Sequence, residues 1–166
     1  MGQPTGHEDQ RLRCLLVQQP YASLMAFGRK CWEFRSYETK RRGRIGIAAS
    51  PSSALATKSS ALNAASHSFP RGVLLATADL VNCFYVTSAD IRKAIAEPVM
   101  VSIHGHEILT VGFPIGEPEE DVREAINSNG WESYVWELAD IKPLPNPIAV
   151  GKRSRSTWVL ADVGER

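Results

Sequence analysis

The chain has 166 residues, of which 43% are hydrophobic and 22% charged, and its formal net charge is +1. This length and composition suit one globular domain with a real core, and they exclude a disordered or polybasic protein. No apolar run approaches membrane-spanning length, the N-terminus has no signal-peptide core, and three cysteines without a CxxC pair do not indicate a disulfide scaffold. We therefore expect a cytoplasmic protein, or a nuclear one if its source is eukaryotic, without a membrane partner.

The N-terminal third of the chain predicts strands around one short helix. Residues 1–12 are polar and are expected to be flexible, ahead of a single domain at 13–162. The first expected elements are a strand at 13–19, a helix at 20–27 that Gly28 caps, a strand at 30–37 and a strand at 45–50. Within 30–37 the alternation places Trp32 and Phe34 on one face, and Glu33 and Arg35 on the other.

The rest of the chain adds further strands with helices between them. Ser50 and Pro51 are expected to begin a helix that ends before Pro70, and Ser88 to cap the helix that follows the long apolar strand at 72–86. Farther along, we expect a strand at 107–115, an acidic helix at 118–130, a strand at 131–138, a proline-rich crossing at 142–148, a loop at 151–156 and a last strand at 157–162. This order predicts an α+β fold built on a small mixed β-barrel.

Four segments in order resemble the ASCH domain family, named for activating signal cointegrator homology, and together they cover about residues 13–161. They are "QPYASLMAFGRKCWEFRSY", "RRGRIGIAAS", "PRGVLLATADLVNC" and "WELADIKPLPNPIAVGKRSRSTWVL". The positions that match are Gln19-Pro20, Ala22, Gly28, Lys30, Glu33, Arg35, Arg42-Gly43, Trp136, Pro147, Gly151 and Trp158.

The resemblance implies a PUA-like fold, a small twisted barrel with helices packed on the outside. It also implies a cleft lined by residues 28–35. The roles proposed for the family are RNA binding in a translation or coactivator context, deacylation of N-acylated cytidine by some small bacterial members, and nuclease activity in others.

The residues expected at the base of this cleft are Lys30, Glu33 and Arg35. Glu33 and Arg35 share a strand face about 7 Å apart, so their heads can meet. Glu33 would then orient the Arg35 fork or accept from a base edge, and Arg35 would bind phosphate bidentately. Lys30 would supply a mobile point charge. Tyr21 is either a stacking platform for a base or a core residue.

Basic residues are expected at the mouth of the cleft. Residues 29–44 carry seven Lys or Arg side chains against two Glu, and residues 152–155 add three more. Such asymmetry indicates an acidic partner. The mouth residues are Arg42, Arg44, Lys152, Arg153 and Arg155. We expect nucleic-acid binding, to RNA rather than DNA, with no cofactor and with a salt slope of roughly −3 to −5 for four to six phosphate contacts.

Several other interpretations stay open. In a hydrolase acting on a modified nucleoside, or a ribonuclease, Lys30 would be the general base and Glu33 its partner, although Glu33 stands where the amidohydrolase-like members have threonine. A protein-interaction adaptor would use the acidic segment 117–124. The "IHGHE" sequence at 103–107 is expected to be a hairpin tip and not a metal site. Cys31, beside Lys30, is expected to be a small packed side chain; the alternative is a thiol of lowered pKa.

Overall fold

The structure, a computed structural model, describes residues 11–55, 60–94, 98–103, 105–111, 127, 132–151 and 156–164. The strands are β1 (Arg11–Val17), β2 (Trp32–Arg35), β3 (Gly43–Ala49), β4 (Val73–Thr87), β5 (Pro98–Ile103), β6 (His106–Val111), β7 (Glu132–Ala149) and β8 (Trp158–Asp162). The helices are α1 (Tyr21–Ala26), α2 (Ser60–Ser66) and α3 (Ser88–Ala94). Residues 1–10, which hold most of the expected flexible terminus, lie outside these ranges.

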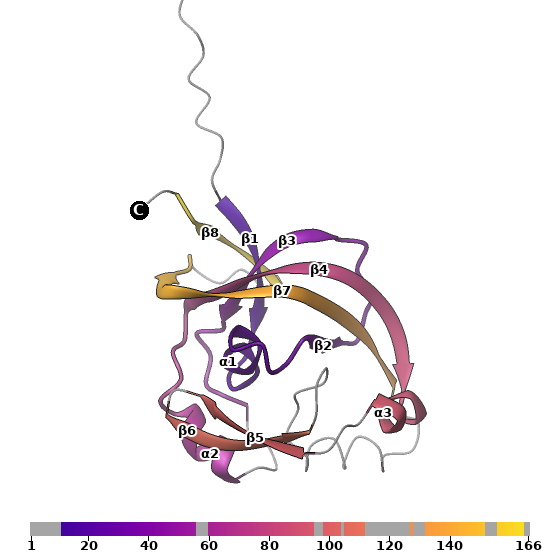
Figure 1. The fold of residues 1–166 in the computed structure, drawn as a ribbon. Coiled ribbons are helices and arrows are strands. Elements are labelled where there is room, and N and C mark those ends of the chain that lie inside the picture. The colour runs from indigo at the N-terminus through magenta and orange to yellow at the C-terminus, as the bar shows by residue number, and fades with distance from the viewer. Residues whose placement is uncertain are drawn as a thin grey trace, which may run out of the picture.

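The main sheet is mixed and strongly curled. Its order is β2-β7-β4-β3-β1-β8, and β5 and β6 form a separate hairpin. β1 and β3 pair in parallel, while the other neighbouring strands pair antiparallel. Figure 1 shows β4 and β7 arching over α1, so the sheet forms a half-barrel with β2 and β8 as its edges. The predicted α+β class with a small mixed β-barrel is confirmed, and the barrel is open between these two edges.

The main core lies between the concave face of the sheet and α1. Leu15 of β1, Ile47 of β3 and Trp136 of β7 pack there against Met25 of α1. Five of the six residues of α1 are buried, and the Ser23 amide of its first turn donates to Gln19 Oε1 at 3.1 Å. Since so short a helix is not stable alone in water, its packing holds it. α1 therefore lies inside the curl of the sheet (Figure 1). This position differs from the expectation that the helices pack on the outside of the barrel.

A second layer covers the side of α1 that faces away from the sheet. It consists of α2 and the β5–β6 hairpin (Figure 1). Leu24 of α1 packs with Leu62 of α2, Ile103 of β5 and Phe69 in one cluster. The helix thus contacts both layers, and it joins the sheet to the hairpin.

The prediction of a helix from Ser50 is wrong. Residues 51–55 are not helical, and α2 begins at Ser60. Ser50 Oγ accepts the Ser52 amide at 3.2 Å, as in a cap, but the Leu55 amide then donates to the Gln19 carbonyl at 2.8 Å. This long-range bond takes an amide that a helix would use, and it ties the segment to the start of α1.

The prediction of a proline-rich crossing at 142–148 is also wrong, because β7 continues through it to Ala149. β4 pairs with this half of β7, whereas β2 pairs only with residues 134–137. Among the described strands, none pairs with the other side of the proline-rich half, and a sheet tolerates proline in such an edge position. Its register against β4 shifts between Leu74 and Ala76.

The ends of some helices and strands also differ from the predictions. Ser88 does not cap α3 but begins it, and Asp90 of the first turn accepts from the preceding Thr87, from its amide at 2.8 Å and its hydroxyl at 2.9 Å. The strand expected at 107–115 is described only as far as Val111, and β5 was not predicted. The expected acidic helix at 118–130, apart from residue 127, lies outside the described residues.

Candidate nucleic-acid interface

Gly28 turns the chain from α1 into β2. Its φ of +68° lies in the left-handed region that glycine adopts without strain, and its amide donates to the Met25 carbonyl at 2.8 Å. The predicted glycine cap is therefore confirmed. β2 then pairs with β7, with Glu33 directly opposite Trp136. Since residues opposite each other share a face, Glu33 points toward the main core.

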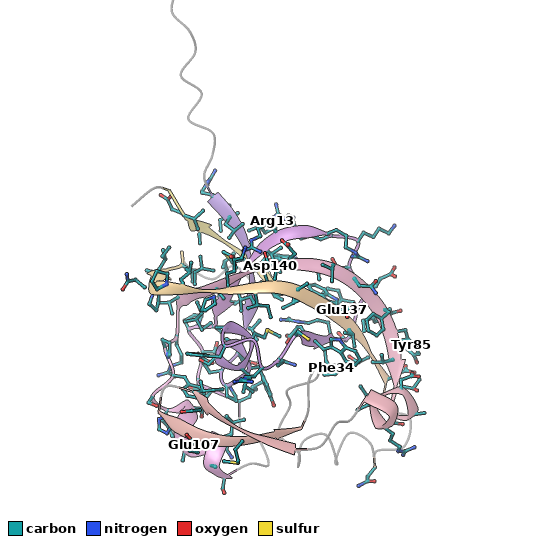
Figure 2. All side chains as sticks on the ribbon, viewed as in Figure 1. Arg13, Phe34, Tyr85, Glu107, Glu137 and Asp140 are labelled. Atoms are coloured by element: carbon teal, nitrogen blue, oxygen red, sulfur yellow. The ribbon has the colours of Figure 1, made fainter. Side chains whose placement is uncertain are left out.

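Lys30 is buried at the start of this turn, with 1% of its surface exposed. Its Nζ donates to the Trp32 carbonyl at 2.5 Å and lies 3.9 Å from Glu33 Oε2. The same atom lies 5.0 Å from the ring centroid of Phe34 and 5.5 Å from that of Tyr21. Figure 2 shows Phe34 beneath the arch of β4 and β7. The expected mobile point charge is therefore wrong, because these groups replace water around the ammonium and fix it.

Glu33 holds the Arg35 guanidinium in place. Its Oε1 lies 2.8 Å from Arg35 Nη2, which also donates to the Leu16 carbonyl of β1 at 2.9 Å. The two heads meet, as the alternation predicts. The Arg35 side chain is 20% exposed, so it is the member of this group that reaches solvent. We call Lys30, Glu33 and Arg35 the β2 network.

Two stacked tryptophans extend from the β2 network. The rings of Trp136 and Trp158 are inclined by 21° with centroids 5.8 Å apart. Arg35 Cζ lies 5.8 Å from the Trp136 centroid, and Arg41 Cζ lies 5.1 Å from the Trp158 centroid. Trp136 is completely buried, whereas Trp158 is half-buried. This tryptophan stack connects the β2 network to the basic segment that follows β2.

A hydroxyl pair joins the segment after β2 to the segment before β8. The Tyr37 and Thr157 hydroxyls are hydrogen-bonded to each other. Trp136 Nε1 donates to the Tyr37 carbonyl at 3.1 Å, and the Leu16 amide donates to the Thr157 carbonyl at 2.8 Å. Sequence reasoning missed both residues. The available signal for Tyr37 was its position two residues after Arg35, which continues the alternation of the strand. No local pattern indicated that Thr157 lies beside Tyr37.

The basic residues expected at the mouth separate into three groups. Arg42 is exposed and lies in the segment that carries Arg41; its Nη1 donates to the carbonyls of Thr39 and Arg41 at 3.0 and 2.7 Å. Lys152, Arg153 and Arg155 lie outside the described residues, directly before Ser156 in the sequence. Arg44, described next, is the third group.

Arg44 lies on the face of β3 away from the main core. Its Nη1 is 3.4 Å from Asp79 Oδ1 and 3.2 Å from Asp140 Oδ2, and Lys142 Nζ is 2.9 Å from Asp140 Oδ2. The hydrogen bond from Lys142, with Arg44 nearby, holds the pKa of Asp140 below its usual range. In Figure 2 Asp140 and Phe34 lie on opposite sides of β7. The structure therefore does not bring Arg44 to the β2 network.

Tyr21 and Cys31 lie near the network but face inward. The Tyr21 ring is partly buried and packs against both clusters that flank α1. Burial first, and then the charge of Glu137, raise the pKa of Cys31 to about 11, against a lowering by Lys30. A resting thiolate at neutral pH is therefore not favoured. For Cys31 the packed interpretation agrees with the structure.

A metal site and a membrane-spanning helix were also considered for the described residues. Within the described ranges, no three His, Cys, Asp or Glu side chains gather as a metal site would require, and His104 lies outside those ranges. No helix in the described part of the chain has the length and apolar composition needed to cross a membrane.

Comparisons with known proteins point to one family. The sequence model of the ASCH domain matches residues 15–146. Human activating signal cointegrator 1 is 32% identical over 123 residues, which are 64% of this chain and 21% of that protein. The chain thus spans about a fifth of the length of this curated relative.

Solved structures of a bacterial protein are also similar. The ASCH protein from Zymomonas mobilis is 16% identical with a TM-score of 0.46, covering 85% of this chain and 75% of that one. Two point mutants of the same protein give TM-scores of 0.47 and 0.48, with coverage of 82% and 85% of this chain and 74% and 75% of theirs, at 14% and 15% identity.

Proposed function

The chain belongs to the ASCH domain family, and we propose that it binds single-stranded nucleic acid, RNA in preference to DNA, at the surface around Arg35, Tyr37 and Trp158. The observation that carries the proposal is the Tyr37–Thr157 hydrogen bond. It joins the segment leading to the basic run 40–44 to the segment that follows the basic run 152–155. Arg35 lies two residues before Tyr37. The exposed Lys40 and Arg42 follow this bonded pair along one segment, and Lys152, Arg153 and Arg155 precede it in the sequence of the other.

Each residue has a distinct role in this proposal. The exposed Lys40 and Arg42, together with Lys152, Arg153 and Arg155, attract phosphates. Arg35 binds a phosphate or a base edge through the guanidinium N–H groups that do not contact Glu33. In this binding role Lys30, with 1% of its surface exposed, acts through Glu33. Its charge attracts the Glu33 carboxylate and holds it in position.

The test is an anisotropy titration of a labelled single-stranded RNA dodecamer, and the same sequence as DNA, over a series of salt concentrations. We expect log K to fall linearly with log salt, and the RNA to bind more tightly. The double variant Lys40→Gln/Arg42→Gln should reduce the slope by about 1.4, from about 0.7 per phosphate contact. The matched control Arg44→Gln/Lys142→Gln removes the same two charge types from the opposite face and should leave the slope unchanged.

Two results count against this surface. If neither oligomer binds the folded protein at the lowest salt, the nucleic-acid function is wrong. If the control lowers the slope as much as the Lys40/Arg42 variant does, binding occurs on the face that carries Arg44.

A second candidate function is hydrolysis of an N-acylated cytidine or of RNA. One observation favours it: the buried Lys30 Nζ and the Glu33 carboxylate, 3.9 Å apart, bring together two of the group types that general acid–base catalysis uses. Chromatography of N4-acetylcytidine, or of a labelled RNA, incubated with the protein should then show product. Lys30→Met should abolish turnover while the circular dichroism spectrum is kept. The absence of product with the unaltered protein would exclude this candidate for the substrates tried.

A further inference from the structure

The tryptophan stack offers a platform that the sequence did not suggest. Among the aromatic residues, only Tyr21 was named as a stacking platform, with a core position as its alternative. In the structure Tyr21 packs between two clusters and lies under the Lys30 ammonium. Trp158 instead is half-buried at the start of the edge strand β8, beside the exposed ring of Tyr37. The aromatic residue best placed to meet a ligand is thus Trp158.

Besides Trp136, the Trp158 ring has Arg41 as a neighbour. Its guanidinium lies 5.1 Å from the ring centroid. Among the described residues, this guanidinium makes no hydrogen bond or ion pair, whereas the Arg41 backbone amide donates to Thr39 Oγ1 at 3.2 Å and the Arg41 carbonyl accepts from Arg42 Nη1 at 2.7 Å. A planar cation resting on an aromatic face, held by nothing else, occupies the position that a planar base would take.

We propose that Trp158 is the stacking platform for one nucleobase, and that the Arg41 guanidinium moves from the ring to a neighbouring phosphate when the base binds. This inference rests on the proposed nucleic-acid function, because it names the base-reading part of the same surface. The exchange conserves interactions: the ring keeps a planar partner, and the arginine replaces a cation–π contact by a charge-assisted pair. Stacking of this kind tolerates any base, because each one has a flat π-face.

The platform is held rigidly from beneath. Trp158 pairs with Leu15 on β1, and the preceding residue is bonded to Leu16 through its carbonyl. The buried Trp136 supports the ring at 5.8 Å. A platform that is already ordered loses little conformational freedom when a ligand stacks on it, and this favours binding.

The test compares an oligouridylate decamer with an abasic ribose–phosphate decamer of the same charge, using tryptophan fluorescence and anisotropy at one salt concentration. In the unaltered protein the oligouridylate should quench fluorescence and bind more tightly than the abasic chain. Trp158→Phe should remove most of the quenching, and Trp158→Leu, which has no ring, should weaken oligouridylate binding roughly 5- to 100-fold, the range expected from loss of one stacked base. Abasic binding should change less than about twofold, since stacking does not contribute to it. Trp32→Phe is the matched control and should leave both affinities unchanged.

A photocross-link provides a measurement that needs no variant. A decamer containing 4-thiouridine, irradiated with the unaltered protein, should cross-link at Trp158. If the oligouridylate binds but Trp158→Phe leaves the quenching unchanged and Trp158→Leu leaves the affinity unchanged, or if the cross-links fall elsewhere, the platform is wrong while the nucleic-acid function stands. If neither decamer binds at low salt, both are wrong.

Discussion

Replacing Glu33 by glutamine removes the carboxylate that Lys30 and Arg35 share, and it leaves two cations close together in a mostly buried site. At an effective dielectric constant of about 20, the Lys30–Glu33 separation of 3.9 Å corresponds to about 4 kcal/mol of attraction. The Arg35–Glu33 separation of 2.8 Å corresponds to about 6 kcal/mol. The cost of burying the carboxylate itself, several kcal/mol, offsets part of both. We therefore expect Glu33→Gln to lower the free energy of unfolding by about 3–5 kcal/mol.

Urea unfolding followed by circular dichroism measures this loss. For a domain with a total stability of about 5–15 kcal/mol, the midpoint should fall by roughly 2 M while the slope m stays the same. Asp79→Asn is the matched control, because it removes one carboxylate from the exposed Arg44 pair and should cost no more than about 1 kcal/mol. The double variant Lys30→Met/Glu33→Gln should recover part of the loss, since it no longer leaves the ammonium without its carboxylate. If Glu33→Gln costs no more than Asp79→Asn, the β2 network does not stabilise the fold in the way argued here.

Three further experiments test other parts of the structure. A β-carbon at Gly46 would lie 2.4 Å from Cys14 Sγ, so Gly46→Ala should lower the free energy of unfolding by about 1–3 kcal/mol in urea; an unchanged midpoint would contradict this packing. With its pKa raised to about 11, Cys31 should react with iodoacetamide at pH 8 far more slowly in the native protein than in urea, as followed by mass spectrometry; equal rates would contradict its burial. Because the folded pKa of Asp140 is lowered, its stabilising effect is present above the unfolded pKa, near 4, and is lost as pH falls through the folded pKa. Asp140→Asn should therefore lose less stability than the unaltered protein between pH 4 and pH 2, measured by urea midpoints.

Local patterns in the sequence predicted the residues that lie close together along the chain. Alternation placed Glu33 and Arg35 on one face, and glycine after an apolar segment predicted the turn at Gly28, because both signals depend only on neighbouring residues. The order of strands and the family resemblance then predicted the architecture. The described part of the fold agrees with these predictions except where long-range bonds intervene.

The features that the sequence did not predict depend on contacts between distant segments of the chain. Charge alone did not indicate that Lys30 is buried, since this follows from the rings and the carbonyl that surround it. The pairing of Arg44 with Asp79 and Asp140 depends on the register of β3, β4 and β7, which no local pattern specifies. The meeting of Tyr37 with residue 157 joins segments 120 residues apart, and it follows from the curl of the sheet.

The position of α1 between the two layers has a consequence for hydrogen exchange. It is the shortest of the described helices, and an isolated helix of six residues would exchange its amide hydrogens almost as fast as an unfolded chain. In the fold, Met25 packs on the sheet side and Leu24 on the hairpin side. Deuterium can therefore reach these amides only when an opening event separates the layers. The slowest exchange outside the strands should thus occur in the element with the least helical stability of its own, and its rate should report how cooperatively the sheet and the hairpin unfold.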